Sequence, residues 1–282
     1  MKGLDCIYHY TKFDSFASML KNAVSNNKIT FWASSAYTMD DQMEMAYGYP
    51  LLNHVLSEFS KKRNLDNKQR LDILLTKLYC TFSGPDSDYF LPKDRSPFVI
   101  SFTRALNSDF MWKNYGDEGK GICLFFDQKK IKSNTDDKMT YLYDVAYVNN
   151  EKIDLEIWRA FIKLIEDQAK FCQAITPLLK YENDTDRVKK FLLNTLCPII
   201  SALVKGEDFT HEEEVRWMKL CDNKEAKCRK RKCDSINYID VEIPLDCLVG
   251  IETGPNFDRI DELHVLCEEK GLVLNNTKIT LV

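Results

Sequence analysis

The stretch PFVISFTRALNSDFMWKNYGDEGKGICLFFD, residues Pro97 to Asp127, decides the fold of this chain. Phe98 to Phe102 near its start and Gly121 to Phe126 near its end are short runs rich in β-forming residues. Both runs are too short and too apolar to be amphipathic surface helices. We therefore predict two core strands of one sheet at these positions.

The segment between the two runs predicts a short helix. Asn107-Ser108-Asp109 is typical of a turn that caps a helix, and Gly116 and Gly119 would end that helix. Trp112 and Tyr115 would then be packed between the two strands. We expect this pair to belong to the core or to form the wall of a pocket.

The composition indicates one folded domain. With 282 residues, of which 44% are hydrophobic, the chain can bury a substantial core. We predict a single domain, residues 1–282, with a helical insertion at about residues 150–206. The net charge of −4 argues against a general nucleic-acid binder, because such domains are strongly basic, but it is compatible with a local basic patch.

The cysteines and the apolar runs indicate the cellular compartment in which the protein is expected. Ten cysteines are scattered without close CxxC pairs, which is typical of reduced thiols. The N-terminal residues have no signal-peptide core, and no run approaches the ~20 apolar residues of a membrane span. We therefore expect a cytoplasmic protein that does not span a membrane. Cys221, Cys228 and Cys233 lack the spacing of a zinc site, so no metal is predicted there.

Hydrophobic periodicity predicts the other elements of an α+β fold. The capping-box pattern from Thr11 to Asp14 predicts the start of a helix that ends near Asn26 and Asn27. Further helices are expected at 48–60, 66–81, 154–172, 184–204 and 258–270, the last of them ended by Gly271. Strands are expected at 4–10, 29–32, 140–148, 238–243, 248–251 and, at a sheet edge, 277–281.

The segment HEEEVRW, residues 211–217, carries the most chemistry. If it is a strand, Glu212, Glu214 and Arg216 share one face and the residues between them share the other. Two carboxylates and a guanidinium in a row are either a functional site or a solvated outer face with a surface ion pair. The residues alone leave both interpretations open.

Two other charged stretches also allow a structural and a functional interpretation. Asp40, Asp41 and Glu44 would cap the following helix, or would join Glu212 and Glu214 in a divalent-metal cluster. The basic run from Lys227 to Lys232 would form a solvated hairpin tip between two strands. Alternatively, it would contact nucleic-acid phosphates weakly, through the side chains of Lys227, Arg229, Lys230, Arg231 and Lys232.

Short motifs follow one another in order along nearly the whole chain. They are Tyr8-His9-Tyr10-Thr11, Phe31-Trp32-Ala33-Ser34-Ser35, Asp40-Asp41-Gln42-Met43-Glu44, Ser101-Phe102, Met111-Trp112, Tyr115-Gly116, the Glu-x-Glu-x-Arg of residues 212–216, Ile243-Pro244-Leu245-Asp246 and Gly254-Pro255-Asn256. This ordered set resembles the bacterial family called domain of unknown function 2971. Where that family has Asn-Asp-Pro-x-Glu, this chain keeps Asp41 and Glu44 and departs at Asp40.

That family is distantly similar to ADP-ribosyltransferases, and the resemblance implies both a fold and an activity. The implied fold is a split antiparallel or mixed β-sheet core around a cleft for nicotinamide adenine dinucleotide (NAD). The implied activity is transfer of ADP-ribose from NAD to a protein or nucleic acid, or hydrolysis of NAD, as in a bacterial toxin or an anti-phage effector. NAD would be a substrate, and the macromolecular acceptor is not identified.

The resemblance also implies roles by position. His9 would orient a ribose hydroxyl, Ser34 and Tyr37 would lie beside the nicotinamide, Glu214 would be the catalytic carboxylate and Glu212 would orient the acceptor. A carboxylate near the ribose stabilises the positive charge of an oxocarbenium-like transition state. The remaining cofactor contacts would come from Tyr10, Thr11, Trp112, Tyr115 and Arg216.

Each implied role has a structural alternative. His9 could be a hydrogen-bonded core histidine, and the cleft could bind a nucleotide or a protein partner without catalysis. A metal-dependent nuclease built on the acidic residues is a third hypothesis. The enzyme hypothesis requires His9 and Glu214 to line one pocket on either side of Tyr37 or another aromatic residue. Side chains on opposite faces of the sheet would contradict it.

Overall fold

The structure is a computed structural model that describes residues 5–23, 27–38, 95–134, 140–148, 202–230, 235–272 and 278–280. The helices predicted at 48–60, 66–81 and 154–172, most of the helix predicted at 184–204, and the acidic stretch 39–44 lie outside these ranges. The helical insertion predicted at 150–206 is therefore described only at residues 202–206.

The described elements alternate between strands and short helices. In chain order they are β1 (Cys6–Thr11), α1 (Phe13–Lys21), β2 (Lys28–Ser35), η1 (Ala36–Thr38), β3 (Arg95–Thr103), α4 (Asp109–Asn114), η3 (Asp117–Gly119), β4 (Ile122–Asp127), α5 (Gln128–Ser133), β5 (Thr140–Asp144), β6 (Ala146–Val148), β7 (Val204–Gly206), η5 (Glu207–Glu212), β8 (Glu214–Asp222), η6 (Asn223–Glu225), β9 (Lys227–Lys230), β10 (Ser235–Pro244), η7 (Leu245–Cys247), β11 (Leu248–Thr253), α10 (Ile260–Glu269) and β12 (Lys278–Thr280).

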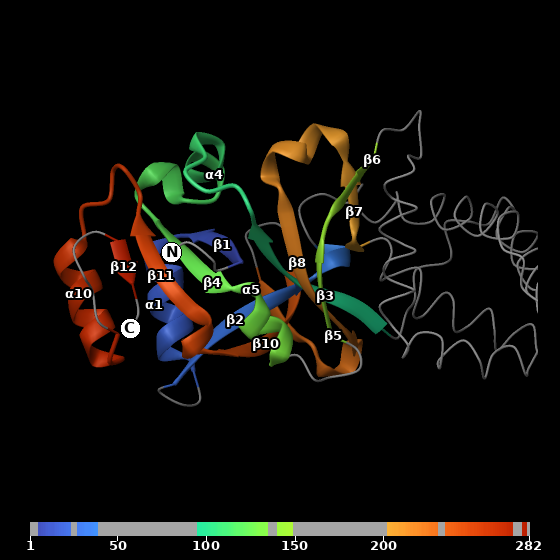
Figure 1. Ribbon diagram of the computed structural model, residues 1–282. Coiled ribbons are helices and arrows are strands. Elements are labelled where there is room, and N and C mark those ends of the chain that lie inside the picture. The colour runs from blue at the N-terminus through green and yellow to red at the C-terminus, as the bar shows by residue number, and fades with distance from the viewer. Residues whose placement is uncertain are drawn as a thin grey trace, which may run out of the picture.

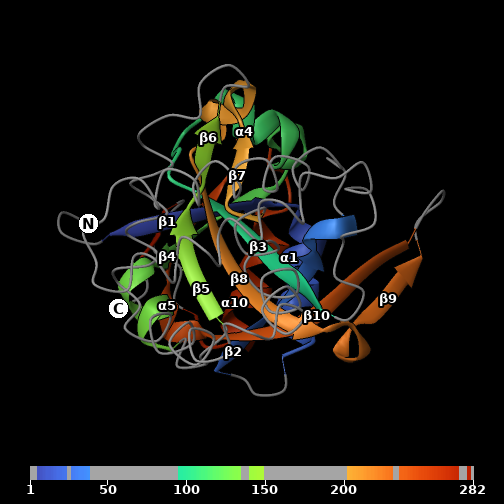
Figure 2. The ribbon, with the colours of Figure 1, turned by 90° about the vertical axis from the view of Figure 1, so that its right-hand side faces the viewer.

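Within the described ranges, ten strands form one curled antiparallel sheet. Its main path runs β12-β11-β4-β1-β3-β2-β10-β9, while β8 pairs with β3 and β5 off this path. Figure 2 shows β5, β8 and β3 side by side, with the β10–β9 hairpin turning away from them. A parallel pair, β6 and β7, lies beside this sheet (Figure 1). The α+β class is confirmed.

The sheet divides at β3. One edge of β3 pairs with β8 along its whole length. The other edge is shared, because β1 pairs at Thr103 and β2 pairs at Phe98 and Val99. β1 and β2 therefore diverge around Ser101, and α1 connects them in sequence. This divergence positions the candidate site.

Apolar side chains cover both faces of the sheet near β1 and β4. The inner face carries the main core, which includes Phe31, Phe102 and Leu124, and the apolar sides of α1 and α10 pack into this core. On the outer face, α4 covers β1 and β4 with a second cluster. Its buried members are Tyr10, Met111, Trp112, Cys123 and Phe125. β4 is consequently buried at every position.

The two strands and the short helix predicted for the central stretch are confirmed, but Trp112 and Tyr115 do not pack between the two strands. β3 and β4 contain the two apolar runs, and α4 lies between them in sequence. Ser108 caps α4, since its Oγ accepts from the backbone nitrogen of Met111 at 3.4 Å. β1 separates β3 from β4 in the sheet.

Other elements occur as predicted but with different limits. The capping box at Thr11 is wrong, because Thr11 is held in β1 by pairing with Ile122, and Lys12 precedes α1 without a side-chain cap. α1 ends at Lys21, before the predicted end. The strand predicted at 140–148 is two strands, and Val204 begins β7 instead of ending a helix. The end of α10 before Gly271 and the edge strand β12 are confirmed.

Candidate functional site

Two hollows lie next to each other where the sheet divides. The larger, which we call the split hollow, has a volume of about 500 Å³ and lies between α1 and strands β2, β3 and β10. Its lining includes Thr11 and Ser34. The smaller, which we call the Glu214 hollow, has a volume of about 150 Å³ and lies between β1, α4, β7 and β8. His9 and Ser101 line both hollows, so the two hollows share a wall.

His9 fills the gap where β1 and β2 diverge. Its Nδ1 lies 2.9 Å from the backbone oxygen of Ser101, and its ring packs edge-on against Phe31 and Phe102, with centroids 5.1 and 5.9 Å away. Burial lowers the pKa of His9, so the imidazole is neutral at neutral pH. Because a carbonyl oxygen only accepts, we assign the proton to Nδ1, which leaves Nε2 as an acceptor.

Four charged side chains form a buried cluster at the Glu214 hollow: Lys205, Glu212, Glu214 and Arg216. Arg216 has no exposed surface, and none of the others is more than 6% exposed. Arg216 donates from Nε and Nη2 to the two carboxylate oxygens of Glu214, at 2.8 and 2.9 Å. Lys205 Nζ lies 2.6 Å from Glu212 Oε2 and 3.5 Å from Glu214 Oε2. We call these four residues the ion cluster; its formal charges cancel.

Neighbouring groups complete the hydrogen bonding of the ion cluster. Tyr115 donates from its hydroxyl to Glu212 Oε1 at 2.6 Å. Arg216 donates from Nη1 to the backbone oxygen of Ala202 at 2.7 Å. The hydroxyl of Tyr147 accepts from the backbone nitrogen of Glu214 at 2.7 Å. The cluster thus ties α4, β6 and β7 to β8.

The positive partners keep Glu214 ionised. Burial by itself would raise the pKa of Glu214, but the charges and hydrogen bonds of Arg216 and Lys205 hold this pKa below its ordinary value. Burial raises the pKa of Tyr115, and its hydrogen bond to the carboxylate of Glu212 raises it further. Both carboxylates of the cluster are therefore acceptors with strong donors already in place.

The interpretation of HEEEVRW as a solvated face is wrong. Glu212 ends η5, and Glu213 adopts a left-handed conformation with φ of 42°, so β8 begins at Glu214. Glu214 and Arg216 share one face of β8, as predicted, and that face is buried. Glu212 reaches the same place from outside the strand, where Lys205 holds it.

His9 and Glu214 both border the Glu214 hollow, but their side chains leave the sheet on opposite faces. His9 pairs with Leu124, a member of the main core on the inner face. Glu214 pairs with Thr103, which pairs with Tyr8 on the outer face. Directly paired residues point to the same side of a sheet, and successive residues alternate. This arrangement does not meet the requirement of the enzyme hypothesis that the two side chains act together.

The other predicted cofactor residues divide into three groups. Thr11 and Ser34 line the split hollow, whereas Tyr10 and Tyr115 line the Glu214 hollow. The third group lies outside the lining of both: Tyr37 in η1, Trp112 against Tyr10 in the outer cluster, and Arg216 in the ion cluster. Trp112 and Arg216 are 9% and 0% exposed, so they support the walls and do not reach a ligand in this arrangement.

The basic run begins as a strand. β9 covers Lys227 to Lys230 and pairs antiparallel with β10, so the predicted hairpin is confirmed and the limits of its tip are corrected. The ammonium of Lys227 forms an exposed ion pair with an aspartate of β10. Arg229 lies over the ring of Trp32, 5.1 Å from the centroid. Residues 231–234 lie outside the described ranges.

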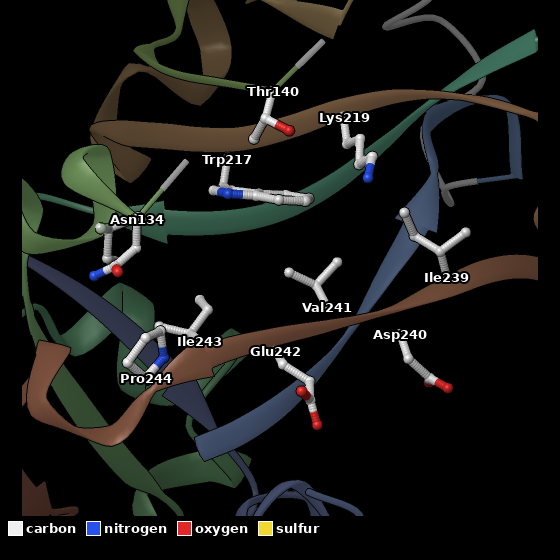
Figure 3. Close-up of a pocket in the computed structure, with 11 residues that line it drawn as sticks. Asn134, Thr140, Trp217, Lys219, Ile239, Asp240, Val241, Glu242, Ile243 and Pro244 are labelled. Carbon is white, nitrogen blue, oxygen red and sulfur yellow. The ribbon is translucent and has the colours of Figure 1, made fainter. Parts of the chain in front are cut away.

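A third hollow, of about 250 Å³, separates β8 from β10 (Figure 3). Figure 3 shows Trp217 of β8 facing Val241 and Ile243 of β10 across it, while Asp240 and Glu242 point away. No predicted site residue lines this hollow. It interrupts the main core and brings no catalytic pair together.

Neither a metal site nor a membrane span is found in the described part of the chain. No three His, Cys, Asp or Glu side chains there are grouped so that they could hold a metal ion. The acidic stretch 39–44, which belongs to the metal hypothesis, lies outside that part. None of the helices described has the length and hydropathy needed to cross a bilayer.

Several residues at the two hollows are missing from the sequence prediction. Lys205 belongs to the ion cluster and Tyr147 binds the backbone nitrogen of Glu214, and no local pattern marks either residue. Thr30 and Trp32 line the split hollow together with Ser34. Their period-two spacing along β2 is a signal that could have grouped them with Ser34.

Comparison with known proteins supports the family resemblance over part of the chain. Residues 111–217 match the sequence model of a family described as "Protein of unknown function (DUF2971)". The match extends from α4 into β8. It includes Trp112, Tyr115 and the Glu-x-Glu-x-Arg segment, and it covers five of the eleven residues that line the Glu214 hollow.

The curated relatives are viral. The chain is 26% identical over 243 residues to the early transcription factor 82 kDa subunit of Monkeypox virus, and equally to that of Vaccinia virus (strain Ankara). These alignments cover 75% of this chain and 32% of each relative, so the chain spans about a third of their length. No solved structure matches this chain.

The ion cluster predicts a non-additive response to mutation. Glu214→Leu or Arg216→Met alone leaves a buried charge unpaired and should lower the free energy of unfolding by about 3–5 kcal/mol. The double variant removes one charge of each sign, keeps the Lys205–Glu212 pair and should be more stable than either single variant. Denaturant unfolding of all four proteins measures this coupling. Additive losses would show that the pair is not energetically coupled.

The same cluster predicts acid sensitivity. The pKa of Glu214 is lower in the folded protein than in the unfolded chain, where it is about 4.3. Its carboxylate thus contributes stability above that value, and this contribution is lost as the pH falls through the folded-state pKa. Between about pH 5 and about pH 2, the double variant should lose less unfolding free energy than the wild type. Equal losses, measured by denaturant titration at each pH, would contradict the role of Glu214.

Proposed function

We propose that this chain binds a nucleotide, NAD foremost, in the split hollow. One observation carries the proposal: His9 and Thr11 of β1 and Ser34 of β2, all expected at a nucleotide cleft, line a single hollow where the two strands diverge. Its volume of about 500 Å³ lies within the roughly 300–1,000 Å³ of small-molecule sites. Binding does not require His9 and Glu214 to act on one atom.

The chemistry of the lining suits a nucleoside. Neutral His9 supplies an acceptor at Nε2, and the hydroxyls of Thr11 and Ser34 can donate or accept. Ribose hydroxyls need such mixed partners. Phe31 and Ile100 add apolar surface to the same wall, which favours a partly dehydrated ligand.

A second candidate function is ADP-ribosyl transfer from NAD or hydrolysis of NAD, with Glu214 acting without His9. It is favoured by the ionised carboxylate of Glu214 in the hollow that adjoins the split hollow. Such a carboxylate stabilises a cationic ribose in the transition state. Arg216 and Lys205 balance its charge, so the effect would be weaker than that of an unpaired carboxylate. The roles as a cytoplasmic toxin or anti-phage effector belong to this candidate.

The viral relatives suggest nucleic acid as a binding partner for this proposal. Their printed name is that of a transcription factor subunit. A weak contact to nucleic acid would involve the exposed side of β9, where Lys227 and Arg229 lie, together with Lys230, Arg231 and Lys232. Its strength would fall steeply with salt, because phosphate contacts release counterions.

Nucleotide binding is tested by filling the split hollow. Ser34→Leu places a larger side chain in the lining and should weaken NAD binding at least about tenfold in isothermal titration calorimetry. Ser133→Leu is the matched control: Ser133 is exposed on α5, away from the hollow, so affinity should not change. Equal affinities of the wild type and Ser34→Leu would contradict the assignment of the site.

Catalysis is tested by release of free nicotinamide from NAD, with cell extract as a source of acceptors. The wild type should release nicotinamide, and the Glu214→Leu, Arg216→Met double variant should not, because it lacks the carboxylate. The double variant is preferable to a single variant because it avoids an unpaired buried charge. Nicotinamide release by a folded double variant would exclude Glu214 as the catalytic carboxylate, and no release by the wild type would exclude the transferase candidate.

A further inference from the structure

The hydroxyl of Thr30 is buried in the wall of the split hollow, and no described residue is its hydrogen-bond partner. Thr30 is 4% exposed, and within the described ranges its Oγ1 makes no hydrogen bond. A buried hydroxyl normally has a partner, because leaving water without one costs free energy. An unsatisfied group at this position therefore points to something that occupies the hollow.

A group of two aromatic side chains and one guanidinium lies on the same side of the sheet. Trp32 follows Thr30 by two residues on β2 and so shares its face, yet 41% of Trp32 is exposed. The ring of Tyr238 lies 5.3 Å from the ring of Trp32, and the guanidinium of Arg229 lies 5.1 Å from it. All four residues line the split hollow. Aromatic rings and guanidinium planes in this arrangement stack against planar rings.

The charged side chains around the split hollow would not repel a bound anion. Asp14 lines it too, but its carboxylate accepts from Arg259 Nη1 at 2.7 Å. Asp240, which pairs across the sheet with Trp32, is bound by Lys227. The acidic side chains on this side are therefore balanced. Arg229 contributes a positive charge at the aromatic group.

We propose that the split hollow binds the base and phosphate of a nucleoside monophosphate. The base stacks on the Trp32–Tyr238 pair, Thr30 Oγ1 hydrogen-bonds to the nucleoside, and Arg229 pairs with the phosphate. This inference rests on the proposed nucleotide binding and adds which residues recognise which part of the ligand. We favour a free nucleotide over a nucleic-acid strand because the lining surrounds a hollow of about 500 Å³, whereas strand binders have an extended basic groove.

The decisive variant is Thr30→Val, which replaces the hydroxyl by a methyl group of nearly the same size. In the free protein it removes an unsatisfied polar group, so Tm should rise by about 2 °C or more. The same change should weaken binding of adenosine 5′-monophosphate (AMP) about tenfold, because the bound ligand loses a partner. Thr30→Ser keeps the hydroxyl and should keep the affinity. A structural role alone would change Tm without changing affinity.

The other contacts are tested by calorimetry with AMP, adenosine and ribose 5-phosphate. Trp32→Ala should weaken AMP and adenosine binding at least about tenfold. Phe110→Ala, at another exposed aromatic residue on α4, should leave both unchanged. Arg229→Gln should weaken AMP about tenfold and adenosine much less, because only AMP carries the phosphate.

The outcomes separate this inference from the proposed function. If NAD binds and Ser34→Leu abolishes its binding, but Thr30→Val and Trp32→Ala leave AMP affinity unchanged, the placement of the base is wrong and nucleotide binding stands. If neither NAD nor AMP binds the wild type at millimolar concentration, both fail. Binding of a single-stranded oligoadenylate without binding of AMP would overturn the free-nucleotide pocket. The full pattern of weakened binding supports it.

Discussion

A neutral, fully hydrogen-bonded set of four buried charges holds the outer side of this sheet together. A buried charge costs several kcal/mol unless it is paired, and here Arg216 covers both oxygens of Glu214 while Lys205 joins the two glutamates. The partners come from β7, η5 and β8, with tyrosines from α4 and β6 added by hydrogen bonds. Ion pairs and hydrogen bonds thus hold together segments that are far apart in the sequence. The same ion pairs position the walls of the Glu214 hollow.

A second constraint comes from the pairing of β3. One edge of a strand cannot pair with two neighbours at the same residue, so β1 and β2 must diverge after sharing that edge. The backbone carbonyl of Ser101 lies between the residues of β3 that pair with β1 and with β2, so neither strand pairs with Ser101. The side chain of His9 hydrogen-bonds to this carbonyl instead. The split hollow opens at the same interruption. The sheet forms a concave site where its own hydrogen bonding cannot continue.

The two hollows differ in how fully their polar groups are satisfied. In the Glu214 hollow every charged group has a partner, which favours a structural contribution and weakens the electrostatic effect available for catalysis. In the split hollow, Thr30 Oγ1 lacks a partner among the described residues and Trp32 is exposed. Unsatisfied groups lower stability in the free protein, and a ligand that satisfies them recovers that free energy. This difference is the physical reason for proposing that a ligand binds in the split hollow and that the ion cluster stabilises the fold.

Short-range patterns in the sequence determined the elements of the central stretch. The apolar runs of β3 and β4, the cap at Ser108 and the helix end at Gly271 depend on neighbours a few residues away, so they could be predicted. Only the tertiary structure decided that Glu212, Glu214 and Arg216 are buried, because Lys205 and Tyr115 reach them from other segments. It also decided that His9 and Glu214 face opposite sides, since strand register, fixed by long-range pairing, sets the direction of every side chain in the sheet.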